Sequence, residues 1–203
     1  MKKTLMAMVA ISCLLAVSCR KDPSNQLSDE ESRIYITEQT PGTNFGSFTT
    51  FAVRDSVLNI DGDKTYYQLN NVDRAFIEAV RNNMRARGYT EVTRDQSPTI
   101  GLQVVRITRT TTGTIIWGGG GWWGGGGWWG PGWGWGAPVW GTTFEIREGM
   151  LAVDMYDLKK GVTENKIYLM WSGLIRGRGI FDVNTAQSQV DQLFTQSPYI
   201  KRG

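Results

Sequence analysis

Few side chains in this sequence have the types and spacing that catalysis requires. The 203 residues include no histidine, so the commonest general base and metal ligand is absent. Both cysteines, Cys13 and Cys19, lie near the start of the chain, which leaves no disulfide or Cys-based metal site for the remainder. Asp154 and Asp157 have opposite parity in one expected strand, so they cannot form a catalytic carboxylate pair. Because no Gly-x-Ser-x-Gly or Ser-x-x-Lys motif follows Cys19, we expect no catalytic residue, no metal site and no cofactor.

Cys19 has the chemistry of a lipid attachment site. Lys2 and Lys3 precede an apolar run from residue 5 to 17, which is typical of an export signal and too short for a spanning helix. The following Ala-Val-Ser-Cys resembles a bacterial lipobox, in which the cysteine becomes the lipidated N-terminus. We therefore expect residues 1–18 to be a lipoprotein signal peptide. Several acyl chains, palmitate among them, would then anchor the chain at Cys19.

Two alternatives to lipidation at Cys19 stay open. Cys13 follows Ala-Ile-Ser with similar spacing, but cleavage there would halve the apolar run and leave part of it on the mature protein. A soluble secreted protein that buries the thiol is the other alternative.

Residues 19–33 are predicted to form a polar tether, because they contain a proline and no apolar periodicity. Arg20-Lys21-Asp22 partly resembles the Lys-acid signal that directs some bacterial lipoproteins to the cell surface, and an ordinary solvated tether is the alternative. We expect a lipid-anchored protein of the cell envelope, held at the outer membrane and either periplasmic or surface-exposed.

The charge balance opposes a nucleic-acid partner. The chain has 22 Lys and Arg and 19 Asp and Glu, and two of the bases, Lys2 and Lys3, precede Cys19. From Cys19 onward, 20 bases and 19 acids leave a net charge of +1. A dedicated nucleic-acid binder has a far more basic surface.

A Trp/Gly-rich insertion at residues 117–140 is the most unusual segment. Its 24 residues are eight Trp, twelve Gly, two Pro, one Ala and one Val. It is not expected to span a membrane, because Gly and Pro disfavour a helix and an irregular backbone in lipid leaves its amides unpaired. Loops this long without secondary structure are either functional or disordered.

Tryptophan suits membrane interfaces, protein interfaces and the apolar faces of sugars. The candidate interaction residues are therefore Trp117, Trp122, Trp123, Trp128, Trp129, Trp133, Trp135 and Trp140. The alternative is a low-complexity insertion without a ligand. We expect residues 118–139 to be dispensable for folding, because lengthening a closed loop costs only about 0.6 kcal/mol per doubling.

The rest of the body reads as one α+β domain, residues 34–203. The clearest element is a helix at 71–87, capped by Asn71, with apolar residues every fourth position and Gly88 as terminator. The other expected elements are strands at 48–53, 100–111, from 144, 151–157 and 167–175, turns at 59–64 and 158–161, and a helix from Asn184 to Pro198. This order predicts a small antiparallel or mixed sheet packed against two helices, with the insertion as a long loop between strands.

Three segments carry a resemblance to a known family. They are Phe48-Thr49-Thr50-Phe51-Ala52, the strand Gly149-Met150-Leu151-Ala152-Val153-Asp154-Met155-Tyr156-Asp157, and Met170-Trp171-Ser172-Gly173. Together with the lipobox and the insertion, they resemble the bacterial lipoprotein family known as domain of unknown function 4136, over residues 34 to 196. The resemblance implies a small α+β envelope domain without an established activity and supplies no catalytic residues. Trp171 is expected to lie in the core, with a close backbone approach at Gly173.

These observations favour a non-enzymatic, lipid-anchored envelope protein that presents an aromatic loop to a membrane, a partner protein or a glycan. The alternative is an enzyme that acts on cell-wall or surface glycan, with the tryptophans as substrate platforms. That enzyme would need two carboxyl groups about 5 to 9 Å apart near the loop.

Overall fold

The computed structural model describes residues 27–61, 64–109, 113–117, 134–135, 140–144, 149–164 and 166–203. In chain order the strands are β1 (Ile34–Gln39), β2 (Thr50–Val53), β3 (Val57–Asp61), β4 (Lys64–Gln68), β5 (Thr90–Glu91), β6 (Ile100–Arg109), β7 (Gly113–Trp117), β8 (Gly134–Trp135), β9 (Trp140–Phe144), β10 (Met150–Asp157), β11 (Lys166–Ile167) and β12 (Leu169–Arg176). The helices are α2 (Asn71–Ala86), α3 (Leu158–Glu164) and α4 (Ala186–Thr195), with short 3₁₀ turns at Phe45–Ser47, Arg94–Gln96 and Val183–Thr185.

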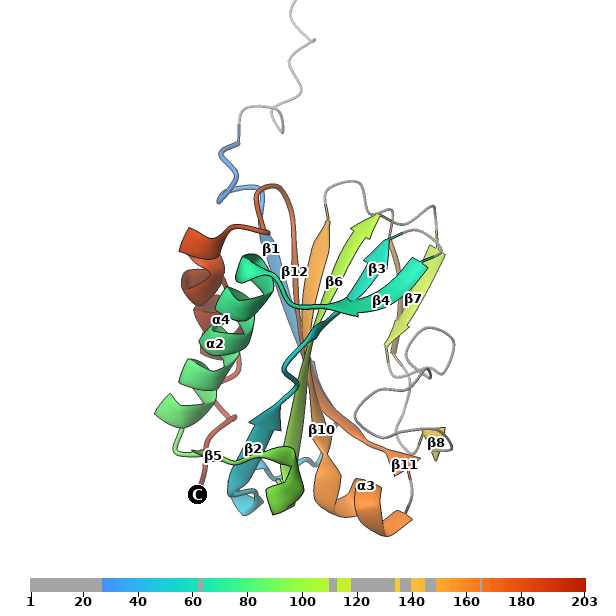
Figure 1. The fold of residues 1–203 in the computed structure, drawn as a ribbon, viewed down its shortest axis with the longest axis vertical. Coiled ribbons are helices and arrows are strands. Elements are labelled where there is room, and N and C mark those ends of the chain that lie inside the picture. The colour runs from blue at the N-terminus through green and yellow to red at the C-terminus, as the bar shows by residue number, and fades with distance from the viewer. Residues whose placement is uncertain are drawn as a thin grey trace, which may run out of the picture.

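An open, mixed sheet of eight strands forms the centre of the molecule (Figure 1). Its order is β1-β12-β10-β6-β2-β5, and β3 also pairs with β6 and carries β4. The pairs β1–β12, β12–β10 and β10–β6 are antiparallel, whereas β2 and β3 lie parallel to β6. With α2 and α4 packed on one face, this confirms the predicted α+β fold.

The main core lies between the sheet and these two helices. The apolar stripe of α2 is buried at Phe76, Ile77, Val80 and Met84, as its periodicity predicts. Trp171 of β12 is 0% exposed, its ring centroid lies 5.2 Å from that of Phe194 on α4, and its indole N–H donates to Ser197 Oγ at 2.9 Å. The expected core position of Trp171 is confirmed.

The absence of a side chain at Gly173 allows the Trp171 ring and Leu193 to pack close to the backbone of β12. A Cβ at Gly173 would stand 2.6 Å from the Trp171 indole and 2.9 Å from Leu193. The residue two positions after the tryptophan must therefore be glycine for the ring to lie flat against the strand.

The N-terminus of α2 lies one residue earlier than its sequence pattern suggests. The N-cap is Asn70, whose side chain accepts from the Asp73 amide, while the Asp73 carboxylate accepts from the Asn70 amide. This reciprocal pair is a capping box. Asn71 was the expected cap and is instead the first helical residue, because only Asn70 has an acid three positions ahead of it.

The expected hairpin between β10 and β12 forms, but its connection is longer than predicted. The two strands pair antiparallel, as expected. The segment predicted as a turn at 158–161 instead begins the helix α3. The Asp157 carboxylate accepts from the Lys160 amide at 2.9 Å, and Leu158 packs over Gly101, where an added Cβ would meet its side chain at 3.0 Å. The local Asp157 cap and the nonlocal packing of Leu158 on Gly101 together favour a helix here instead of the expected turn.

Two further elements have bounds that differ from those expected. The turn placed at 59–64 is narrower, because residues 59–61 belong to β3 and residue 64 begins β4. The last helix begins at Ala186, after a 3₁₀ turn in which Asp182, not Asn184, is the capping side chain.

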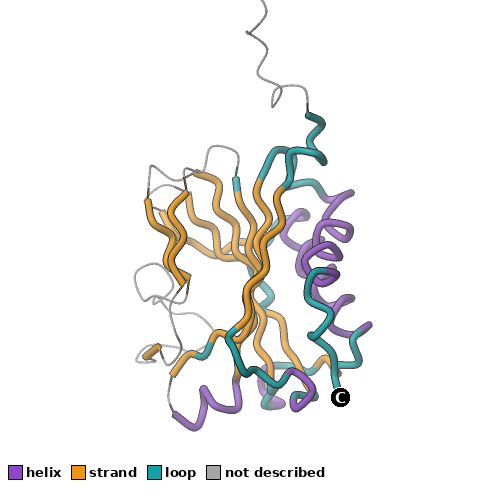
Figure 2. The backbone as a smooth tube through the Cα atoms, turned by 180° about the vertical axis from the view of Figure 1, so that it is seen from behind, coloured by secondary structure: helices purple, strands orange, loops and turns teal. Residues whose placement is uncertain are grey.

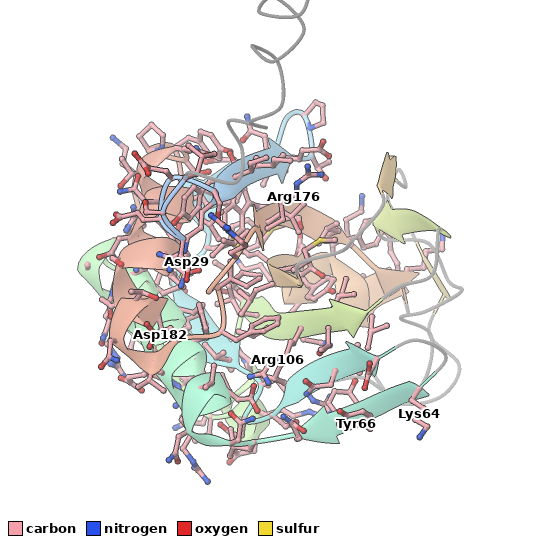
Figure 3. All side chains as sticks on the ribbon, turned by 90° about the horizontal axis from the view of Figure 1, so that it is seen from above. Asp29, Lys64, Tyr66, Arg106, Arg176 and Asp182 are labelled. Carbon is pink, nitrogen blue, oxygen red and sulfur yellow. The ribbon has the colours of Figure 1, made fainter. Side chains whose placement is uncertain are left out.

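Residues 27–33, within the expected tether, contact the loop that follows β12. Arg178 donates to the Leu27 carbonyl and forms an ion pair with Asp29, and Arg33 donates to the Gly179 carbonyl at 3.1 Å. The register places Ile34 beside Arg176, so this segment joins the sheet at the end where β12 finishes. We call this the tether end, and Figure 3 views the molecule from that side, with Arg176 labelled.

A second layer lies on the side of the sheet away from α2 and α4. There β7 and β9 pair antiparallel as a separate two-stranded sheet, from Gly113 opposite Phe144 to Trp117 opposite Trp140. Figure 2 shows the helices and these strands on opposite sides of the main sheet. β8 pairs parallel with β11, which follows α3. Among the described residues, no helix is long and apolar enough to cross a bilayer.

Candidate functional site

Two of the family-like segments, residues 149–157 and residues 170–173, lie on neighbouring strands, and each places a polar side chain on the same face of the sheet. We call this the outer face, because it is the face away from α2 and α4. Asp154 of β10 stands directly opposite Ser172 of β12. The Ser172 hydroxyl donates to Asp154 Oδ1 at 2.7 Å, and the Tyr156 hydroxyl donates to Asp154 Oδ2 at 3.3 Å. A carboxyl group thus receives two hydroxyl donors from two adjacent strands.

This carboxyl group is almost completely enclosed. Asp154 is 3% exposed, and burial raises its pKa from 3.8 to about 6, against the opposing effect of the two hydroxyl donors. Burial beside Asp154 also raises the pKa of Tyr156 well above 10, so its hydroxyl stays protonated and remains a donor. Asp154 therefore titrates close to neutral pH.

Asp154 belongs to a row of polar side chains that crosses four strands. The register aligns Glu38 of β1 with Ser172, Ser172 with Asp154, and Asp154 with Gln103 of β6. Ser172, Asp154 and Gln103 are buried, whereas Glu38 at the sheet edge is exposed. Burying a polar group lowers the stability of the fold unless the group has a hydrogen-bond partner. A row of buried polar side chains in the centre of a sheet is therefore a candidate functional site.

The neighbouring rows, toward the tether end, are apolar. Their buried members form a second cluster, separate from the main core: Leu58, Ile60, Val105, Ile107, Met150, Ala152 and Leu174. Neither α2 nor α4 lies on this side of the sheet, and among the described residues the strands β7 and β9 do (Figures 1 and 2). The outer face therefore has an apolar surface that is buried, and β7 and β9, the strands at the two ends of the insertion, lie on that side.

The predicted site residues divide into two groups. Cys19 lies outside the described residues, as do Trp122, Trp123, Trp128, Trp129 and Trp133. The backbones of Trp117, Trp135 and Trp140 belong to β7, β8 and β9. Trp117 and Trp140 form the last pair of the β7–β9 ladder, and Trp135 pairs with Ile167 of β11. The ladder therefore brings the two ends of the insertion together.

Sequence reasoning missed the Asp154–Ser172 contact. Parity within one strand correctly separates Asp154 from Asp157, but it gives no information about the neighbouring strand. The available signal was a single acid within an otherwise apolar strand, Met-Leu-Ala-Val-Asp-Met-Tyr, which places a carboxyl group inside the fold.

The comparisons with known proteins can now be set beside this geometry. The family model described as Domain of unknown function (DUF4136) matches residues 36–199. The chain belongs to the DUF4136 family. The match spans both strands of the Asp154–Ser172 contact and the Trp/Gly-rich insertion, which confirms the resemblance that the sequence motifs indicate.

A solved DUF4136 structure has the same fold. It is the crystal structure of a DUF4136 family protein from Bacteroides thetaiotaomicron at 1.60 Å resolution, 25% identical in sequence, with a TM-score of 0.61. The similarity covers 84% of this chain and 98% of that one. No curated protein matches the sequence.

The site's chemistry is that of a buried hydrogen-bond network. No group of three or more His, Cys, Asp or Glu side chains in the described part of the chain could hold a metal ion. Asp154 can gain or lose a proton near neutral pH, and Ser172 and Tyr156 hold the charged form when it appears. In this DUF4136 domain the network lies on the same side of the main sheet as β7 and β9.

Proposed function

We propose that this DUF4136 protein is a non-enzymatic, lipid-anchored envelope protein whose Trp/Gly-rich insertion binds a partner protein or glycan away from its own membrane. The observation that carries the proposal is the placement of two segments. Residues 27–33 contact the tether end of the sheet, whereas the insertion's β8 pairs with β11 next to α3, at the opposite end (Figure 1).

The length of the chain supports this orientation. From Cys19 to Leu27 an extended backbone reaches at most about 28 Å, since each residue adds about 3.5 Å. An anchor at Cys19 therefore keeps the tether end within that distance of the membrane. Strand β10 has eight residues, which corresponds to about 26 Å, so the β8–β11 pair lies about one strand length from the tether end.

The composition of the insertion supports an interaction role. Indole rings contribute most at interfaces where they lose contact with water, and they also stack on the apolar faces of sugars. The pairing of Trp117 with Trp140 brings the first and last residues of the insertion together at the end of the β7–β9 ladder. Contact of this segment with the anchoring membrane is the competing outcome of the experiment below.

The geometry of the acids favours binding over catalysis. Glu38 and Asp154 lie on the same face with β12 between them. A glycan-cleaving pair must reach the substrate from both carboxyl groups. Asp154 is enclosed, with both oxygens occupied by Ser172 and Tyr156, and this arrangement suits a fixed hydrogen-bond network better than proton transfer to a substrate.

The anchor is tested by membrane fractionation of the full-length chain. Cys19→Ala should release the protein into the soluble fraction, because the acyl chains have no attachment site. Cys13→Ala is the matched control and should leave the protein in the membrane fraction. Sedimentation of Cys19→Ala with membranes would contradict the anchor.

The interaction is tested by replacing residues 118–139 with a short Gly-Ser turn. Because Trp117 and Trp140 already pair, we expect the thermal midpoint to stay within a few degrees, and binding to isolated peptidoglycan or to envelope proteins to be lost in co-sedimentation. Tyr66→Ala, which removes an exposed aromatic side chain elsewhere, should change neither property. Binding that survives the replacement, or that occurs only with lipid vesicles, would refute the proposal.

A further inference from the structure

A cavity lies beside β6 at the point where the strand paired with β6 changes from β2 to β3. β2 pairs with residues 100–102 of β6, and β3 pairs with the same edge from residue 105 onward. Residues 54–56 connect the two strands and leave the edge between them. The resulting cavity of about 440 Å³ is lined by this connection, by Arg81 of α2 and by residues 91–94 after β5. Its volume is that of a small-ligand site.

Arg54 is the side chain of this cavity that is best placed to bind an anion. Its guanidinium carbon lies 3.9 Å from the centroid of the Tyr67 ring, and its Nε donates to Ser56 Oγ at 3.2 Å. Among the described residues, its two terminal nitrogens have no acceptor. Stacking and the Nε bond thus fix the plane of the guanidinium and leave the Nη1–Nη2 edge available. Such an edge matches the two oxygens of a carboxylate.

Arg81, Asp55 and Glu91, three other charged residues of the lining, already form ion pairs. Arg81 contacts Asp55 at 2.8 Å and Glu91 at 2.9 Å, and Arg85 forms a second ion pair with Glu91. Arg81 is therefore already paired with carboxylates, whereas the terminal nitrogens of Arg54 have no carboxylate within reach among the described residues.

The same ion pairs indicate which other chemical groups a ligand of this cavity would have. Asp55 is 88% exposed and offers Oδ2 as an acceptor, while its charge is balanced by Arg81. A neutral hydroxyl can donate to this oxygen, whereas an ammonium group would place another cation beside Arg81 and Arg54. Ser56 and Thr93 add hydroxyls to the lining.

We propose that this cavity binds a hydroxylated carboxylate of the sugar-acid class, with its carboxylate on Arg54 and its hydroxyls toward Asp55 and Ser56. The site shares no residue with the insertion or with the Asp154 network. Its test is therefore independent of the function proposed above.

The probe is galacturonate, added to the full-length protein in detergent and followed by saturation-transfer NMR. A ligand of this size is expected to bind with a Kd of about 1 mM. Galactose lacks the carboxylate and should bind about tenfold more weakly or not at all. The backbone amide signals of Ser56 and Thr93 should shift with galacturonate.

Variants then assign the contact to Arg54. Arg54→Gln should weaken galacturonate binding about tenfold or more, and Arg54→Lys should weaken it several-fold, because a lysine keeps the charge but not the two-pronged edge. Arg74→Gln removes an exposed arginine of α2 outside the cavity and should bind like the wild type.

Several results would overturn the proposal. They are equal binding by Arg54→Gln and the wild type, equal binding of galactose, no saturable binding up to about 20 mM, or a preference for inorganic phosphate. If Arg54→Gln does not fold, the wild-type amide shifts decide: shifts that avoid Ser56 and Thr93 exclude the cavity, and shifts at both support it.

Discussion

Replacing Asp154 by asparagine should change how the stability of the domain depends on pH. Asparagine has nearly the same shape, its oxygen can accept from Ser172, and its amide can donate to the Tyr156 oxygen. The substitution therefore keeps the network but removes the titrating group. Its effect should be small in acid, where Asp154 is protonated, and stabilising at higher pH.

The size of the effect follows from the two pKa values. The carboxyl group of Asp154 has a pKa of about 6 in the folded protein and 3.8 as its ordinary value. Between these values the folded state binds more protons than the unfolded state, so stability falls as pH rises from about 4 to about 6 and then levels off. The difference of about 2 in pKa corresponds to about 2 to 3 kcal/mol between pH ~4 and pH ~8.

The assay is urea unfolding of the wild type and of Asp154→Asn, followed by far-UV circular dichroism across this pH range. The free energy of unfolding of the variant minus that of the wild type should rise by about 2 to 3 kcal/mol from acid to pH ~8. Asp157→Asn, which changes a partly buried acid of the same strand that caps α3, is measured alongside as the matched acid-to-amide control. Parallel profiles for Asp154→Asn and the wild type would refute the assignment of a buried, readily protonated carboxyl group.

Two further changes test the core and the helix cap. Trp171→Ala should lower the free energy of unfolding by about 3 to 5 kcal/mol, because it leaves a cavity beside Phe194 and removes the indole donor of Ser197, and a loss below about 1 kcal/mol would place the indole outside the core. Asn70→Ala should cost about 1 kcal/mol in thermal or urea unfolding, whereas Asn71→Ala should cost little; the reverse order would return the cap to Asn71.

The sequence predicts those elements whose own residues show the hydrophobic periodicity of a helix or a strand. The helix α2 repeats its apolar residues with the helical period, and Leu151, Val153 and Met155 alternate along β10 as in a strand, so both were predictable. α3 was not, because Lys159-Lys160-Gly161 is typical of a turn and its helical form depends on Leu158 packing against Gly101. Contacts of that kind exist only after the strands have paired.

The same reasoning separates the predictable part of the candidate site from the rest. Parity shows which face of a strand Asp154 occupies, but the partner Ser172 is fixed by the register of β10 against β12. The cavity at Arg54 depends on another nonlocal fact, the exchange of β2 for β3 along β6. A strand read alone gives neither its neighbour nor its register, so both sites required the fold.

The route by which the chain enters the sheet also sets how the domain responds to mechanical load. The tether leads directly into β1, which is held along six paired residues by β12. A pull between a membrane-bound N-terminus and a partner held near α3 would run along the strands, not across them. Such a force loads the β1–β12 hydrogen bonds in shear, so that they must break together instead of opening one after another. The domain is therefore arranged to stay folded under tension along that axis.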